Sequence, residues 1–322
     1  MKVLMIIDME GCFGVTNLQD YESSRDRMIE ETKNIIDCLI INGISEITVV
    51  DSKSLVIPSS EYSCPVSNGT VCSDIVFVSH IWNLQNIEQY EKAILIGMHA
   101  MSGVCGNFSH TYRPEIKVIK SNNCEIGEVG LLTNYLAKYN VRVCCISGDI
   151  SAKKEAEELG ISFFATNGVE IQLNDVKNVY QKVVSCLCAG TISESIGVQK
   201  YQEYEIEIIF KNKEIVSFLS SYIFDKTVDG IIFKNVVIFY ARLSMLSKYL
   251  NLYYDIKLEM LFRLKKISCL KWSKEEYSII CDDKCKNILR KQIDDINRMD
   301  MMYLVNHFKE YDESSYWDLV CY

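Results

Sequence analysis

The strongest constraint on the fold is a nearly continuous apolar run near the start of the chain, Lys2–Met9. A strand with one wet face alternates between apolar and polar residues, whereas an uninterrupted run is typical of a strand buried on both faces. Strands of this kind occur in parallel sheets that are covered by helices on both sides. We therefore expect an α/β fold.

The remainder of the first half alternates strand-like and helix-like patterns, as a parallel sheet requires. A helical stretch follows Ser24 and has Gly43 as its stop signal. The Asn122-Asn123 pair predicts the turn of a hairpin. Other strands are expected at Ile47–Asp51, Lys92–Met98, Ile116–Ile119, Val141–Ser147 and Tyr204–Phe210, and helices at Glu128–Tyr139, Ala152–Leu159, Asn174–Ala189 and Asn235–Leu250.

Three domains are predicted from these patterns. Residues 1–165 form a metal-binding α/β domain of catalytic type, and residues 166–250 form a smaller α+β domain involved in oligomer contacts. After residue 251 the chain has no proline or glycine, so we expect residues 251–322 to form a helical C-terminal extension. Residues 54–74, rich in Ser, Pro, Asn and Gly, are expected to be a long loop.

Composition excludes several classes of protein. Hydrophobic residues make up 48% of the 322-residue chain, which is ordinary for a folded globular protein. The net charge of −9 argues against a nucleic-acid partner, and no apolar stretch is long enough to predict a membrane partner. Without a secretory signal, the 14 cysteines indicate reduced, mostly buried thiols in a cytoplasmic protein. Cys281, Cys285 and His307 lack a second close cysteine pair, so we interpret them as structural.

Two carboxylates close the first apolar run. Asp8 and Glu10 are two residues apart, so they share one face of an extended chain. They also lie at the C-terminal end of a strand, where open α/β sheets bind ligands. Buried charges need a counter-charge. From these residues alone, a metal ion and a buried Lys or Arg are equally good partners.

Two of the four histidines are expected at the same sheet edge. His99 directly follows the strand Lys92–Met98, and His110 lies on the adjoining loop. Glu128 opens the next helix. A single histidine after a strand is more often structural than a ligand, but three acids and two histidines together are the residue types that hold zinc.

The chain resembles the D-aminopeptidase family, zinc peptidases of the dipeptide-transport type. The resemblance depends on an ordered set of motifs: Ile6-Ile7-Asp8-Met9-Glu10-Gly11, Val50-Asp51-Ser52-Lys53-Ser54, Gly97-Met98-His99-Ala100, Ser109-His110, Gly127-Glu128-Val129-Gly130-Leu131 and Gly148-Asp149 with Ala152–Leu159. It covers residues 1–165 well, residues 200–250 loosely and residues 251–322 not at all.

The resemblance implies a function and roles for individual residues. Asp8 would bridge two Zn²⁺ ions. The remaining zinc ligands that this sequence retains would be Glu10, His99 and Glu128. His110 would be the catalytic histidine. The reaction would be hydrolysis of the N-terminal amide bond of a small peptide or peptide-like substrate, with zinc activating water and stabilising the oxyanion. The family also implies a homo-oligomeric ring, and no other cofactor is expected.

One position departs from the family pattern. Lys53 stands where the family has a zinc-binding histidine in Asp-Ser-His-Ser, and a charged ammonium group is a poor metal ligand. Lys53 could replace the charge of one ion and leave a mononuclear site, or could pair with Asp8 or Glu10 and leave no metal. His80 is a weak candidate for a substitute ligand. The alternative function is therefore a catalytically degenerate homologue that acts as a binding or assembly protein.

The remaining residues near these motifs are interpreted as structural. Cys12 and Cys105 lie near the site segments, but we expect them to be small buried thiols rather than nucleophiles. The run Glu155–Glu158 is expected to be a solvated helix face.

Overall fold

The computed structural model describes residues 1–16, 21–44, 46–51, 74–188, 203–222, 224–263, 271–272 and 279–280. The chain divides into two compact units. The first comprises Met1–Lys211 and Ile232–Ala241, and the second comprises Asn212–Ile231 and Arg242–Tyr322.

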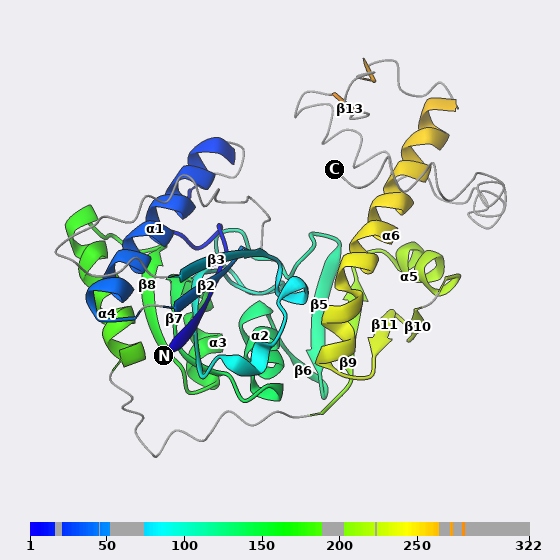
Figure 1. The fold of residues 1–322 in the computed structure, drawn as a ribbon. Helices are drawn as coiled ribbons and strands as arrows, with labels where there is room; N and C mark the ends of the chain where they lie inside the picture. The colour runs from blue at the N-terminus through cyan, green and yellow to red at the C-terminus, as the bar shows by residue number, and fades with distance from the viewer. Residues whose placement is uncertain are drawn as a thin grey trace. The chain divides into compact units, whose positions relative to one another are not determined.

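A six-stranded parallel sheet forms the centre of the first unit (Figure 1). The strand order is β3-β2-β1-β4-β7-β8, and every neighbouring pair is parallel. The strands are β1 (Lys2–Ile7), β2 (Glu46–Asp51), β3 (Asp74–Ser79), β4 (Lys92–Met98), β7 (Arg142–Asp149) and β8 (Ser162–Asn167). The α/β fold class is confirmed. β3 was not predicted.

Both faces of β1 are buried, as its continuous apolar sequence requires. Val3, Met5 and Ile7 belong to a core cluster that also holds buried residues of α1 (Tyr21–Ile41) and α4 (Leu173–Cys188). Leu4 and Ile6 are fully buried as well and alternate with them along the strand. The helices α2 (Glu128–Lys138) and α3 (Lys153–Glu158) cover the opposite face (Figure 1).

Most predicted elements are present, with shifted ends. α1 begins at Tyr21, so Ser24 is a buried residue inside the helix and not its start. Gly43 has φ of 80° and follows the end of α1, as predicted. The predicted helix Ala152–Leu159 is a 3-10 turn, η3 (Ile150–Ala152), followed by α3. Two further 3-10 turns, η1 (Ile81–Asn83) and η2 (Ile87–Gln89), precede β4.

A smaller antiparallel sheet completes the first unit. In it β5 (Ile116–Ser121) pairs with β9 (Ile206–Phe210) and with β6 (Cys124–Glu125). The predicted hairpin is confirmed, since Asn122 and Asn123 connect β5 to β6 with φ of 50° and 64°.

The second unit contains α5 (Lys213–Ser220), β10 (Asp225–Lys226) and the first residues of β11 (Gly230–Phe233). α6 (Val236–Arg263) is longer than predicted; its residues from Arg242 onward belong to this unit. Within the predicted C-terminal extension, β12 (Lys271–Trp272) pairs with β13 (Ile279–Ile280).

Several predictions concern residues that the structure does not describe. Four of them lie outside the described residues: Lys53, residues 54–73 of the predicted long loop, the group Cys281, Cys285 and His307, and most of the extension. The domain boundaries at 165 and 250 stay predictions. Among the helices of the described residues, none is both long and apolar enough to cross a bilayer.

Candidate metal centre

The candidate site lies where the order of strands reverses. From β1 the sheet continues through β2 to β3 in one direction, and from β4 through β7 to β8 in the other. Open α/β sheets bind ligands at the carboxyl ends of the strands beside such a point, because loops from the two halves diverge there. Asp8 directly follows β1, and His99 directly follows β4. The topology therefore places both side chains at the crevice.

Glycines let the ends of β1 and β4 approach each other closely. The amide of Gly11 donates to the carbonyl oxygen of Gly97 at 2.8 Å. Gly97 has φ of 69°, and a Cβ atom there would lie 2.0 Å from the carbonyl oxygen of Asp8. A Cβ atom on Gly11 would lie 2.0 Å from the carbonyl oxygen of Met98. Side chains at these positions would separate the two segments.

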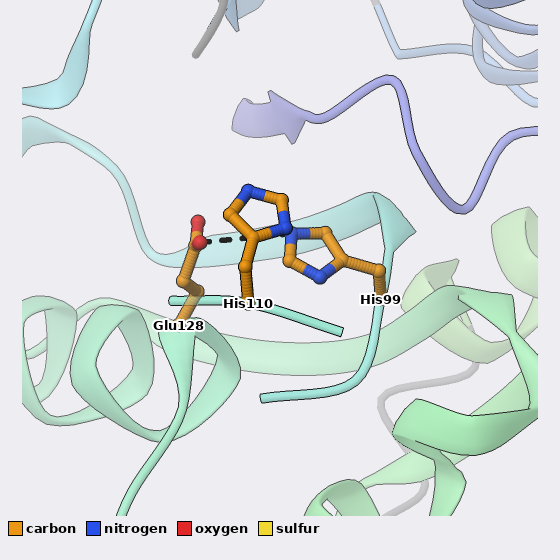
Figure 2. A group of neighbouring side chains, drawn as sticks. All are labelled: His99, His110 and Glu128. Carbon is orange, nitrogen blue, oxygen red and sulfur yellow. Dashed lines mark ion pairs between the residues drawn. The ribbon is translucent and has the colours of Figure 1, made fainter. Parts of the chain in front are cut away.

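Three of the predicted ligands meet in a buried cluster. The Nε2 atom of His99 lies 3.3 Å from Oδ2 of Asp8 and 3.6 Å from Oε1 of Glu128. All three residues are at least 92% buried, Glu128 being the most exposed at 8%. The Glu128 carboxylate comes from the first residue of α2 and faces the two imidazoles (Figure 2).

Glu10 and His110 extend this cluster. The Nε2 atom of His110 lies 3.9 Å from Oε1 of Glu10. The His110 ring stacks on that of His99 with centroids 4.3 Å apart and planes 10° apart (Figure 2). Glu10 is buried, whereas the side chain of His110 is 20% exposed. His110 is thus the member of the cluster that solvent reaches most easily.

Backbone carbonyls fix the orientation of both imidazoles. The Nδ1–H group of His99 donates to the carbonyl oxygen of Ala100 at 3.0 Å. The Nδ1–H group of His110 donates to the carbonyl oxygen of Phe108 at 2.7 Å. In both rings Nε2 is consequently the atom directed at the carboxylates. This is the arrangement that metal-binding histidines adopt, because the second nitrogen is held by a hydrogen bond.

The charges of the cluster are mutually stabilising. Burial lowers the pKa of His99, but hydrogen bonds and charge from Asp8 and Glu128 outweigh it and hold the pKa well above its usual range. Burial raises the pKa of Glu128, but its contacts with His99 outweigh this and leave the pKa below its usual range. A positive charge at this position is therefore stabilised by the buried acids, and a metal ion would supply such a charge.

The donor atoms suit a zinc ion. Two groups, Asp8 with Glu10 and His99, and His99 with His110 and Glu128, each bring three donor atoms within 4.8 Å of one another. Carboxylate oxygen and imidazole nitrogen are zinc ligands. His99 is common to both groups. The residues therefore fit the metal that the resemblance implies, although their individual roles stay predictions.

Other sequence candidates lie apart from these two groups. The His80 ring stacks on Trp82 at 4.2 Å and is in neither donor group. Cys12 is a buried thiol that donates to the carbonyl oxygen of Asp8 at 3.0 Å, as a structural residue would. Cys105 is exposed, so the prediction that it is buried was wrong. Three of the eight cysteines in the described residues are exposed and only two are buried, so the prediction of mostly buried thiols was wrong too.

Sequence reasoning gave no role at the site to three residues near it. The amide of Tyr112 donates to Oε1 of Glu128 at 2.7 Å, from a backbone with φ of 58° that no sequence signal marks. Asp51 is buried at the end of β2, directly beside Ile7 of β1. Glu155 was interpreted as solvated, but its carboxylate accepts hydrogen bonds from the start of α2. Its position in an acidic run concealed this.

Comparison with known protein sequences tests the resemblance to the D-aminopeptidase family. A family model for D-aminopeptidases matches residues 77–183. A D-aminopeptidase of Bacillus subtilis (strain 168) is 29% identical over 166 residues, which cover 49% of this chain and 60% of the relative. The resemblance to the D-aminopeptidases is confirmed.

A solved structure extends the likeness of fold beyond the matched sequence. It is described as the Zn-dependent D-aminopeptidase DppA from Bacillus subtilis, a self-compartmentalizing protease. The TM-score is 0.63 at 20% identity, over 77% of this chain and 97% of the other. At that identity the match establishes a D-aminopeptidase-like fold. Since the sequence match spans only 60% of the curated relative's length, the activity of this chain is a matter for proposal.

Proposed function

We propose that the protein is a zinc-dependent hydrolase of D-aminopeptidase type, which cleaves the N-terminal amide bond of a small peptide or peptide-like substrate. The convergence of Asp8, His99 and Glu128 at the reversal of strand order is the observation that carries the proposal. Similarity to a zinc-dependent peptidase supports the choice of metal and reaction.

Each residue of the cluster has a proposed part. Asp8, Glu10, His99 and Glu128 would hold one or two zinc ions through their carboxylate and imidazole groups. Zinc bound there would polarise the scissile carbonyl and lower the pKa of water. His110, the most exposed of the set, would contact substrate through Nε2 and carry a proton between water and the leaving amine. The buried acids would stay ionised because zinc takes over the balancing charge.

The proposal also covers the oligomeric state and the cellular location of the protein. We infer a homo-oligomer, by analogy with a structural neighbour described as self-compartmentalizing. We also infer a cytoplasmic location. The eight cysteines within the described residues are all free thiols, which supports a reducing compartment.

The first test is the zinc content of protein purified without chelator or histidine tag, together with hydrolysis of D- and L-aminoacyl amides. We expect about one or two ions per chain, and hydrolysis that chelation abolishes. Protein with full zinc occupancy that hydrolyses no such amide would contradict the peptidase assignment.

The second candidate function is a degenerate homologue that binds or assembles without catalysis. The lysine at position 53, in place of a family ligand, is the feature that favours it. Lys53→His separates the two. If the variant binds more zinc and hydrolyses more substrate than wild type, the protein is an enzyme with an altered metal site. If the variant is as inactive as wild type, the binding function is favoured. Lys182→His, at an exposed position of α4, is the matched control and should change neither quantity.

A further inference from the structure

Glu155 of α3 holds the beginning of α2, the helix whose first residue is Glu128. Its Oε1 atom accepts hydrogen bonds from the backbone amides of Gly127 at 2.7 Å and of Gly130 at 3.0 Å. The first amides of a helix lack acceptors within the helix. Gly127, at the N-cap position, supplies no side-chain acceptor of its own. A carboxylate from another helix therefore takes the place of the usual capping residue.

The spacing of the glycines in Gly127-Glu128-Val129-Gly130 follows from this contact. A Cβ atom at Gly127 would lie 2.4 Å from Oε2 of Glu155. A Cβ atom at Gly130 would lie 3.0 Å from Oε1 of Glu155 and 2.6 Å from a side-chain carbon of Ile126. A side chain at Gly127 would occupy the space of the carboxylate, and one at Gly130 would crowd both Ile126 and the carboxylate. The motif and the distant glutamate thus form one structural unit.

Glu128 is consequently held from two directions. Its backbone belongs to the helical turn that Glu155 caps, and its own Oε1 atom accepts the amide of Tyr112 at 2.7 Å. The same Oε1 atom lies 3.6 Å from Nε2 of His99. A carboxylate restrained in this way loses little conformational freedom on binding a metal.

We propose that Glu155 is a positioning residue for the metal site, acting through the start of α2 on Glu128. The inference rests on the proposed function, because Glu128 is a ligand only if zinc binds. Removing the Glu155 acceptor would free two amides in the first turn and let Glu128 move. Partners of this kind typically contribute 10–100-fold to metal affinity.

The experiment compares three variants at position 155 with one control. Zinc affinity is measured by competition with a chromophoric chelator. Glu155→Ala is expected to bind zinc about 10–100-fold more weakly than wild type. Glu155→Gln keeps an oxygen that can accept both amides and is expected to bind almost as wild type does. Glu155→Asp keeps the charge but is shorter by one methylene, and is expected to lose affinity as the alanine variant does.

The matched control lies on the same helix. Glu157 is exposed and pairs with Lys153 at the surface, so Glu157→Ala should leave zinc affinity unchanged. Amide hydrogen exchange of residues 127–131 in the metal-free protein gives a readout that does not depend on zinc. It should be faster in Glu155→Ala and Glu155→Asp, and close to wild type in Glu155→Gln and Glu157→Ala.

The outcomes separate this inference from the proposed function. Faster exchange with wild-type zinc affinity in Glu155→Ala would overturn the positioning role and leave the proposed function standing. An equal loss of zinc affinity in Glu155→Gln and Glu155→Ala would show that the hydrogen bonds accepted by residue 155 do not position Glu128. Absence of zinc binding in wild type would overturn the proposed function, while unchanged exchange in Glu155→Ala would overturn the capping of α2. If the alanine variant does not fold, Glu155→Asp and Glu155→Gln decide the question.

Discussion

Glu31 is a buried carboxylic acid that anchors the segment between β1 and α1. It is 1% exposed, and its Oε2 atom accepts the amide of Phe13 at 2.7 Å. Burial raises its pKa to about 7, against smaller opposing contributions from Phe13 and the hydroxyls of Tyr180 and Thr166. Sequence reasoning predicted this helix but not the role of Glu31, because a single acid in a helix gives no signal that distinguishes a buried anchor from a surface charge.

The raised pKa predicts how stability depends on pH. The unfolded carboxyl ionises near pH 4.5 and the folded one near pH 7, so wild type loses stability as pH rises between these values. Glu31→Gln is neutral throughout and lacks this loss. Relative to wild type, its free energy of unfolding should increase from pH 5 to pH 8 by at most about 3 kcal/mol. Denaturant unfolding at the two pH values checks this, and an equal difference at both would contradict it.

At the scale of elements, the patterns that predict well are those set by backbone geometry. β4 has the predicted bounds, and the Asn122-Asn123 turn has the two positive φ values that a tight hairpin turn requires. The start of α1 was placed four residues late, because Ser24 is a residue type that often caps helices, yet it lies inside this one. Local chemistry marks a turn more reliably than a helix end.

The hairpin offers a test of the turn alone. Asn122 and Asn123 are exposed, so substitution there changes few packing contacts. Asn123→Ala should lower the free energy of unfolding by about 1 kcal/mol, because alanine tolerates the left-handed region poorly. Asn123→Gly should be at least as stable as wild type. Thermal or denaturant unfolding of both variants gives the answer, and an alanine variant as stable as the glycine variant would refute the argument.

For the whole molecule, topology explains why the candidate cluster could be anticipated. Asp8, His99 and Glu128 are far apart in sequence, but each was expected at the carboxyl edge of one sheet, and the structure brings their side chains together. Contacts such as the Tyr112 amide on Glu128 depend on loop conformation and could not be anticipated. Lys53 lies outside the described residues, so its effect on the site stays a prediction.

Metal binding should be visible in the stability of the entire protein. Zinc that binds the folded state alone stabilises it by about 2.7 kcal/mol when the free ion is at 100 times its dissociation constant. We expect chelator-treated protein to melt at a lower temperature and zinc to restore the transition. Magnesium should not restore it, because imidazole ligands suit zinc and not magnesium. Identical melting curves with the two ions would count against a zinc site.

The close contact between the ends of β1 and β4 also limits how this protein can diverge. The backbone near Asp8 and that near His99 meet at Gly11 and Gly97, and a third glycine, Gly148, would place a Cβ atom 2.0 Å from the carbonyl oxygen of Met98. Any larger residue at these positions would separate the strands that carry the cluster. In a saturation library they should therefore remain invariant, and new substrate preferences would have to arise from surrounding loops.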